Sequence, residues 1–123
     1  MILDHIGLSV SDASGSKDFF TKALAPLGIT LVAEVEGWVG FGRQGRPQFW
    51  FGQGAAAQKP MHIAFAAETR AQVRDFYAAA LQAGGKDNGP PGIRTIYHPN
   101  YYGAFVIGPD GHNIEAVCHL AEP

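Results

Sequence analysis

Three side chains of this protein have the types and the placement expected of ligands to a divalent metal ion. His5 and His62 each stand at the head of an alternating, strand-like stretch, residues 5–10 and 62–67. Glu115 lies in a third such stretch, where strand alternation puts it on the face opposite its apolar neighbours. A carboxylate on a face enclosed by protein is costly without a partner, and two imidazoles with one carboxylate leave coordination positions open for water and substrate. The three residues therefore predict a catalytic site for one divalent ion, for which Fe2+, Mn2+, Ni2+ and Zn2+ are all candidates.

The two histidines occupy equivalent positions of an internal repeat. A shift of 57 positions, the difference between 62 and 5, superimposes further identical pairs without a gap: Asp18 on Asp75, Phe19 on Phe76, Ala23 on Ala80, Leu24 on Leu81 and Gly28 on Gly85. A repeat of this period indicates one supersecondary unit used twice. Two related units that pack together can bring equivalent histidines to one ion.

Each repeat has the pattern of a strand, a helix and three further strands. In the first we expect a strand at 2–10, a helix that follows the capping residues 11–14 and ends before Gly28, and strands at 31–36, 38–42 and 48–51. In the second we expect a strand at 61–67, a helix from Thr69 to the Gly84-Gly85 pair, and strands at 94–98, 102–107 and 113–119. Two βαβββ modules, about 1–53 and 61–119, predict one α+β domain over residues 1–123. Its curved eight-stranded sheet would form an incomplete barrel with the helices outside.

Composition limits the partners of the chain. The 123 residues carry a net charge of −2, and no run of like charges forms a footprint for nucleic acid or for an anionic membrane. Cys118 is the only cysteine, so an internal disulfide is impossible. The N-terminal stretch lacks a secretory pattern, and no apolar run approaches the roughly 20 residues that span a bilayer. We expect a cytoplasmic protein whose partner is a small-molecule substrate.

The paired modules, the two strand-initial histidines and the segment Tyr102–Glu115, which contains Pro-Asp-Gly-x-x-Ile-Glu, resemble the vicinal oxygen chelate superfamily. That superfamily contains glyoxalase I, extradiol dioxygenases, and bleomycin and fosfomycin resistance proteins. The resemblance covers essentially the whole chain. It implies that His5, His62 and Glu115 are the metal ligands. It also implies a homodimer, with the ligands drawn from one chain or from two.

The resemblance leaves the reaction open. Glyoxalase I has a second glutamate in the first module, and counting back 66 positions from Glu115 gives Phe49 at the equivalent site. In glyoxalase I that glutamate doubles as a base, so its loss argues against lactoylglutathione lyase activity. Two histidines with one glutamate are similar to the facial triad of Fe(II) extradiol dioxygenases, although Phe105 stands where those enzymes tend to have a tyrosine.

Two classes of function follow. The first is a metal-dependent enzyme that binds vicinal oxygens of a small substrate, either as a glyoxalase-like lyase or isomerase or as an extradiol-type dioxygenase. The second is a non-catalytic protein that sequesters a small molecule, as drug-resistance members of the superfamily do. His98 lies at a distance from the last strand like that of the acid/base histidine of the dioxygenases.

The remaining candidate residues surround these positions. The catalytic candidates are His98, Tyr101 and Tyr102, because a histidine near neutral pKa shuttles protons and the tyrosines cluster beside it. The candidates for substrate binding are Trp38, Phe49 and Trp50, which offer aromatic stacking, and Arg94, which offers a positive charge to an anion.

Overall fold

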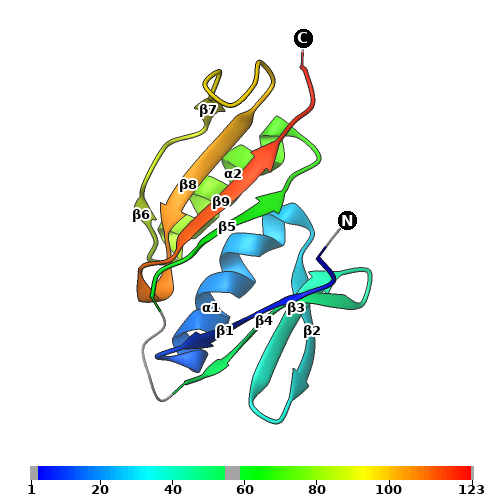
Figure 1. Cartoon of the computed structure of the whole chain (residues 1–123), viewed down its shortest axis with the longest axis vertical. Coiled ribbons are helices and arrows are strands. Elements are labelled where there is room, and N and C mark those ends of the chain that lie inside the picture. The colour runs from blue at the N-terminus through cyan, green and yellow to red at the C-terminus, as the bar shows by residue number, and fades with distance from the viewer. Residues whose placement is uncertain (1–2, 55–58, 123) are drawn as a thin grey trace.

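The computed structural model describes residues 3–54 and 59–122, and it shows two βαβββ modules (Figure 1). The first consists of β1 (Ile6–Val10), α1 (Ala13–Leu24), β2 (Thr30–Val35), β3 (Trp38–Arg43) and β4 (Arg46–Gln53). The second consists of β5 (His62–Ala66), α2 (Arg70–Gln82), β6 (Lys86–Asp87), β7 (Gly92–Ile93), β8 (Tyr102–Ile107) and β9 (Asn113–Cys118). In it the two-residue strands β6 and β7 both pair with β8 and stand in the place of one longer strand. A short 3-10 turn at Ala25–Leu27 follows α1, and another at Pro109–Gly111 precedes β9. Among the described residues, no helix is long and apolar enough to cross a membrane.

The strands form two mixed sheets that do not close on each other. The first sheet has the order β1-β4-β3-β2, and the second has the order β5-β9-β8-β6, with β7 also paired to β8. In each sheet the first strand of the module runs parallel to the last, β1 to β4 and β5 to β9. The predicted modules are confirmed, but the predicted single eight-stranded sheet is divided in two. Ile6, Ile63 and Phe65 line a cleft between the neighbouring edges of β1 and β5.

Both helices begin where their capping side chains predict. The Asp12 carboxylate accepts a hydrogen bond from the Gly15 amide at 3.0 Å, and the Thr69 hydroxyl accepts one from the Gln72 amide at 3.1 Å. In α2 the Gln72 side chain accepts in return from the Glu68 amide at 2.7 Å. The helices start at residues 13 and 70, which are 57 positions apart (70 − 13), so the repeat in the sequence is a repeat in the structure.

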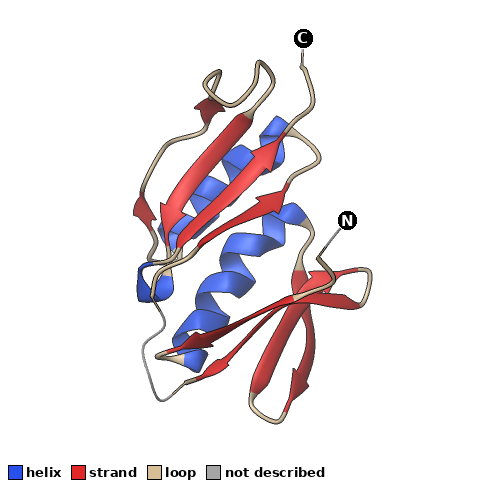
Figure 2. Ribbon diagram, in the orientation of Figure 1, coloured by secondary structure: helices blue, strands red, loops and turns tan. Residues whose placement is uncertain are grey.

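The helices lie side by side, and each covers one face of its own sheet (Figure 2). Phe20 on α1 packs against Phe49 and Phe51 of β4, with ring centroids 4.9 and 5.4 Å apart. Phe49 also meets Phe65 of β5 edge to face at 5.3 Å, so the two modules share one core. Within residues 3–54 and 59–122, the opposite face of each sheet carries no helix, and His62 and Glu115 lie on this open face of the second sheet.

The prediction of a strand at 94–98 was wrong. Just before this segment the pair Gly92–Ile93 joins β8, and the chain then turns, with the Tyr97 amide bonded to the Arg94 carbonyl at 3.0 Å. The Arg94 amide is bonded to the Tyr101 carbonyl at 2.7 Å, which closes a loop over residues 94–101. This loop carries His98 and Tyr101 to the end of the second sheet.

Candidate functional site

His62 and Glu115 form a polar pair on the open face of the second sheet. Parallel pairing of β5 with β9 sets Ala64 opposite Glu115, and His62 shares a face with Ala64 because side chains alternate along a strand. The His62 Nε2 atom lies 2.7 Å from Glu115 Oε1. The Glu115 side chain is 0 % exposed, whereas that of His62 is 54 % exposed. The buried carboxylate predicted from the sequence thus has an imidazole that reaches solvent as its partner.

Tyr101 holds the other carboxylate oxygen. Its hydroxyl donates a short hydrogen bond to Glu115 Oε2. The ring is supported by Tyr97 at 4.8 Å, His98 at 5.5 Å and His119 at 5.3 Å between centroids. Burial, followed by the hydrogen bond to Glu115, raises the pKa of the Tyr101 hydroxyl above its ordinary value. Tyr101 therefore remains a protonated donor over the whole neutral range.

A glycine makes the Tyr101–Glu115 contact possible. A Cβ atom at Gly103 on β8 would lie 3.1 Å from Tyr101 Cε1 and 3.2 Å from Glu115 Oε2. Both distances are shorter than ordinary van der Waals contacts. No feature of the sequence pattern marked Gly103, since its role depends on which side chains cross it.

An aromatic ring and a cation complete this face. Phe105 lies opposite Glu115 in the β8–β9 pairing, and its ring centroid is 6.0 Å from that of His62. The Arg94 guanidinium lies 5.4 Å above the Phe105 ring and donates to the Pro90 carbonyl at 2.6 Å. The structure thus brings Arg94, predicted to bind substrate, to the same face as His62 and Glu115.

His98 lies behind Tyr101 and pairs with His119. Its Nε2 atom is 2.5 Å from His119 Nδ1, and the two rings are stacked with centroids 4.8 Å apart. The Asn100 amide donates to His98 Nδ1 at 3.0 Å, so in neutral His98 the ring proton is on Nε2 and is donated to His119. No local signal in the sequence indicated the pairing of His98 with His119.

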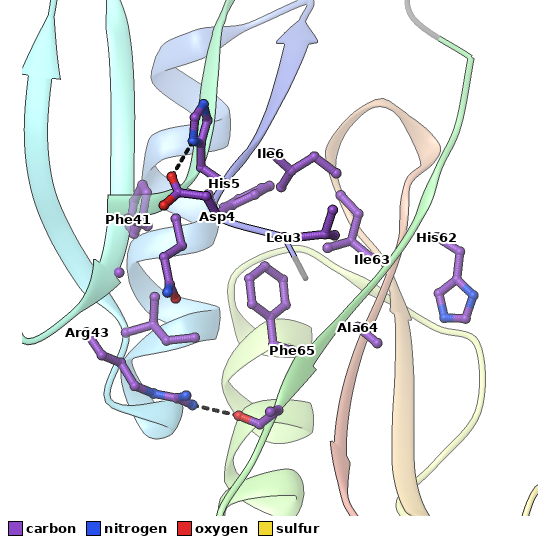
Figure 3. Close-up of a pocket in the computed structure, with 15 residues that line it drawn as sticks. Leu3, Asp4, His5, Ile6, Phe41, Arg43, His62, Ile63, Ala64 and Phe65 are labelled. Carbon is purple, nitrogen blue, oxygen red and sulfur yellow. Dashed lines mark hydrogen bonds and ion pairs between the residues drawn. The ribbon is translucent and has the colours of Figure 1, made fainter. Parts of the chain in front are cut away.

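His5 stands apart from the other two predicted ligands within the chain. Its Nδ1 atom lies 2.6 Å from Asp4 Oδ1, and the hydrogen bond from His5 lowers the pKa of the Asp4 carboxyl. Figure 3 shows the His5 and His62 rings on opposite sides of a cleft, pointing away from each other. Within residues 3–54 and 59–122, no three histidine, cysteine, aspartate or glutamate side chains gather closely enough to hold a metal ion.

The cleft between the modules has a volume of about 330 Å³ and lies between the edges of β1 and β5 (Figure 3). Arg43 at the end of β3 spans it. Its Nε atom donates to the Leu27 carbonyl of the first module at 3.0 Å, and its Nη2 atom donates to the Ala66 carbonyl of the second at 2.6 Å. Arg43 therefore links the two halves of the chain.

The strand register corrects the predicted counterpart of Glu115. In the second module Ala64 lies opposite Glu115, and in the first the equivalent residue Gly7 (64 − 57) lies opposite Trp50. The counterpart is therefore Trp50, at an offset of 65 (115 − 50), and Phe49 points into the core instead. The alternation of Phe49 and Phe51 could have revealed this, because it already places Trp50 on the other face. The first module has an indole where the second has a carboxylate.

The remaining predicted residues divide between the two faces. Trp38 and Trp50 lie on the open face of the first sheet and border a hollow that His5 also lines. Tyr102 faces α2, where the Arg70 guanidinium lies 5.2 Å from its ring centroid. The structure therefore does not bring Tyr102 together with Glu115.

Comparison with known proteins agrees with this architecture. The sequence model of the Glyoxalase/Bleomycin resistance protein/Dioxygenase superfamily matches residues 2–116. The chain belongs to this superfamily. A search of curated proteins finds no match for the chain.

Several solved structures of the superfamily are similar to this chain. A glyoxalase/bleomycin resistance protein from Albidiferax ferrireducens is 27 % identical, with a TM-score of 0.84, and the alignment covers 96 % of this chain and 99 % of that one. A possible glyoxalase from Bacillus cereus is 23 % identical, with a TM-score of 0.70 and coverages of 96 % and 99 %. A superfamily enzyme from Burkholderia phytofirmans is 15 % identical, with a TM-score of 0.72 and coverages of 95 % and 98 %. The last two show a shared fold only.

His62 and Glu115 have the donor types that suit a metal ion of the kind this superfamily often binds. Imidazole nitrogen and carboxylate oxygen ligate Zn2+ at about 2.0–2.2 Å in tetrahedral sites, so two such ligands lie about 3.4 Å apart. The observed 2.7 Å between Nε2 and Oε1 is a hydrogen-bond distance, so the two atoms would separate by roughly 0.7 Å to share an ion. Tyr101 occupies Oε2 and leaves Oε1 facing His62. Two of the three predicted donors are thus already together, and the third has to come from elsewhere.

Proposed function

We propose that this protein is a divalent-metal-dependent enzyme that binds vicinal oxygens of a small substrate. Its reaction is that of a glyoxalase-like lyase or isomerase or that of an extradiol-type dioxygenase. The observation that carries the proposal is the fully buried Glu115 carboxylate held 2.7 Å from the exposed His62 imidazole. A buried carboxylate is expensive without a partner, and a buried carboxylate paired with an imidazole that itself reaches solvent is a candidate ligand pair.

His62 and Glu115 supply two ligands in this proposal, and His5 of a second copy supplies the third. His5 and His62 of one chain point away from each other across the cleft, while each borders an open sheet face (Figure 3). Isologous pairing of two copies lets the first module of each face the second module of the other. The resulting homodimer would contain two equivalent sites.

The bound ion would act as a Lewis acid on the substrate oxygens. Around it, Tyr101 fixes Glu115, and Arg94 offers its guanidinium to an anionic part of the substrate. The first module has Trp50 in place of a carboxylate, so a proton acceptor has to come from the second module. His98, paired with His119, is the candidate for that role.

Subunit mixing tests the shared site. H5A and H62A are matched variants, because the two histidines are repeat equivalents with side chains that are 60 % and 54 % exposed. Each variant alone should lose Mn2+ and Zn2+ binding in equilibrium dialysis. After joint unfolding and refolding, half of the dimers are mixed and each has one intact site, so about a quarter of the wild-type binding should return.

The outcomes separate three cases. Recovery after mixing supports the shared site, and loss without recovery places the ligands within one chain. Wild-type protein that binds no Fe2+, Mn2+, Ni2+ or Zn2+ refutes the metal-dependent proposal. Protein loaded with metal should then be screened with catechols and with glutathione hemithioacetals, with and without oxygen.

A non-catalytic binding protein is the second candidate. It is favoured by the absence of a three-donor cluster within the described part of the chain and by the aromatic face of the first module. Saturable binding of a small molecule by metal-free protein, without turnover on addition of any of the four ions, would support this alternative.

A further inference from the structure

The open face of the first sheet is built as an aromatic surface on a floor of glycines. Trp38 of β3 and Trp50 of β4 are the only two tryptophans of the protein. Around them lie Gly7, Gly40 and Gly52, on three neighbouring strands. Strand interiors disfavour glycine unless another group approaches the backbone closely. Here the approaching groups are the two indoles.

Both indoles lie with one ring face against this floor. A Cβ atom at Gly40 would be 2.9 Å from each of three Trp50 ring atoms, Cε3, Cζ3 and Cη2. Equal distances to three consecutive ring atoms place that point over the ring face, because a point beyond the edge would be nearest to the middle atom. A Cβ atom at Gly52 would likewise be 2.8 and 2.9 Å from Cδ2 and Cε2 of Trp38, the two atoms shared by its fused rings. A side chain at either glycine would therefore lift the indole off the sheet.

The outer faces of the rings border an open hollow. Trp38 is 41 % exposed although a tryptophan gains more than most residues from burial. The hollow is lined by Trp38, Trp50, Gly7, His5 and the residues Val35 and Glu36. The face is the repeat counterpart of the one that carries His62 and Glu115, since Trp50 corresponds to Glu115 in register.

We propose that this indole surface binds a planar aromatic ring of the substrate by stacking. The inference rests on the proposed function and specifies its substrate class: one module takes the oxygens and the other takes the ring. Aromatic pairs gain energy beyond area burial when two flat faces meet, and rings held flat in advance lose little freedom on binding. A saturated molecule of the same size cannot make this contact with both indoles.

The test uses metal-free protein with a chelator, so that its failure is distinct from a failure of metal binding. Because the protein contains two tryptophans, its 1H–15N spectrum has two indole N–H signals, and both report on this surface. The probes are 2-naphthol and decahydro-2-naphthol, which share a carbon skeleton and a hydroxyl but differ in planarity. We expect 2-naphthol to shift both signals saturably and decahydro-2-naphthol to bind at least several-fold more weakly.

Three variants and one control locate the contact. W38L and W50L should each raise the Kd for 2-naphthol roughly two- to twelvefold, the equivalent of one aromatic pair. G40A keeps both indoles but displaces Trp50 from the floor, and it should weaken binding similarly. L120A removes an apolar side chain that is 62 % exposed and follows the last strand of the second module, and it should leave the Kd unchanged.

Three results would overturn the inference. Equal affinity for the two probes would show only an apolar patch. Indole N–H signals that do not shift with either probe would show that this surface is not a binding site for them. Signals that respond to protein concentration and not to 2-naphthol would show that a second copy covers this face.

Discussion

Replacement of Tyr101 by phenylalanine should destabilise the protein far more than loss of one oxygen atom from a loop residue usually does. The Tyr101 hydroxyl donates to Glu115 Oε2, and Glu115 is 0 % exposed, so water has no access to take its place. A hydrogen bond to a charged acceptor contributes about 1.5–3 kcal/mol to stability. Because Y101F leaves a buried Glu115 oxygen without a donor, we expect the loss of stability to lie in the upper half of that range. Y101F should therefore lower the free energy of unfolding by about 2–3 kcal/mol, roughly a 30- to 150-fold change in the equilibrium constant.

Urea unfolding of metal-free protein, followed by far-ultraviolet circular dichroism, measures this change. The slope of the free energy with urea should stay constant, since Y101F leaves the exposed area almost unaltered. Y97F is the matched control, because Tyr97 packs on Tyr101 at 4.8 Å and is 61 % exposed. Its effect should stay within about 0.5 kcal/mol. A Y101F effect as small as that of Y97F would refute the reasoning that Tyr101 neutralises the cost of the buried Glu115 oxygen.

Two further predictions concern the junction of the modules and a buried histidine. R43M keeps the length of Arg43 but removes its hydrogen bonds to the Leu27 and Ala66 carbonyls, so it should cost about 1–2 kcal/mol in the same urea assay, and an unchanged midpoint would contradict the linking role. His112 is buried, its Nδ1 atom accepts from the Met61 amide at 2.9 Å, and burial lowers its pKa below the ordinary 6.5. Below pH 6.5 His112 is protonated in the unfolded chain but stays neutral in the folded chain until a lower pH. The free energy of unfolding should therefore fall as pH falls. H112N keeps an acceptor for the amide and should reduce this fall between pH 7.5 and 5.5, whereas parallel pH profiles for the two proteins would refute the assignment.

The local parts of the fold could be predicted from the sequence. Asp12 and Thr69 fix the helix starts through contacts within four residues, and strand alternation placed Glu115 on the correct face. The loop at 94–101 could not be predicted, because it includes the strand-favouring run Thr95-Ile96-Tyr97. The conformation of this segment is set by the hydrogen bond from the Arg94 amide to the Tyr101 carbonyl, which closes the loop.

The candidate site was predicted in part for the same reason. His62 and Glu115 meet because adjacent parallel strands bring the expected faces together. The position of His5 relative to them depends on how two separate sheets sit in one chain, which no strand pattern encodes. The counterpart of Glu115 was misplaced by one residue, and in a strand such an error moves a side chain from the open face to the core.

The contacts between the halves have a consequence for how the chain can be divided. Arg43 bonds to Ala66 near one end of the junction, and the Ser11 amide donates to the Asp110 carboxylate at 3.1 Å near the other. Between them α1 packs on α2, and Phe49 meets Phe65. Because these contacts are non-covalent and join residues far apart in sequence, a protease nick between the modules should leave two fragments that copurify. Each module thus depends on the core that it shares with the other, and halves from different relatives that keep this core could be recombined to exchange one open sheet face while the other is kept.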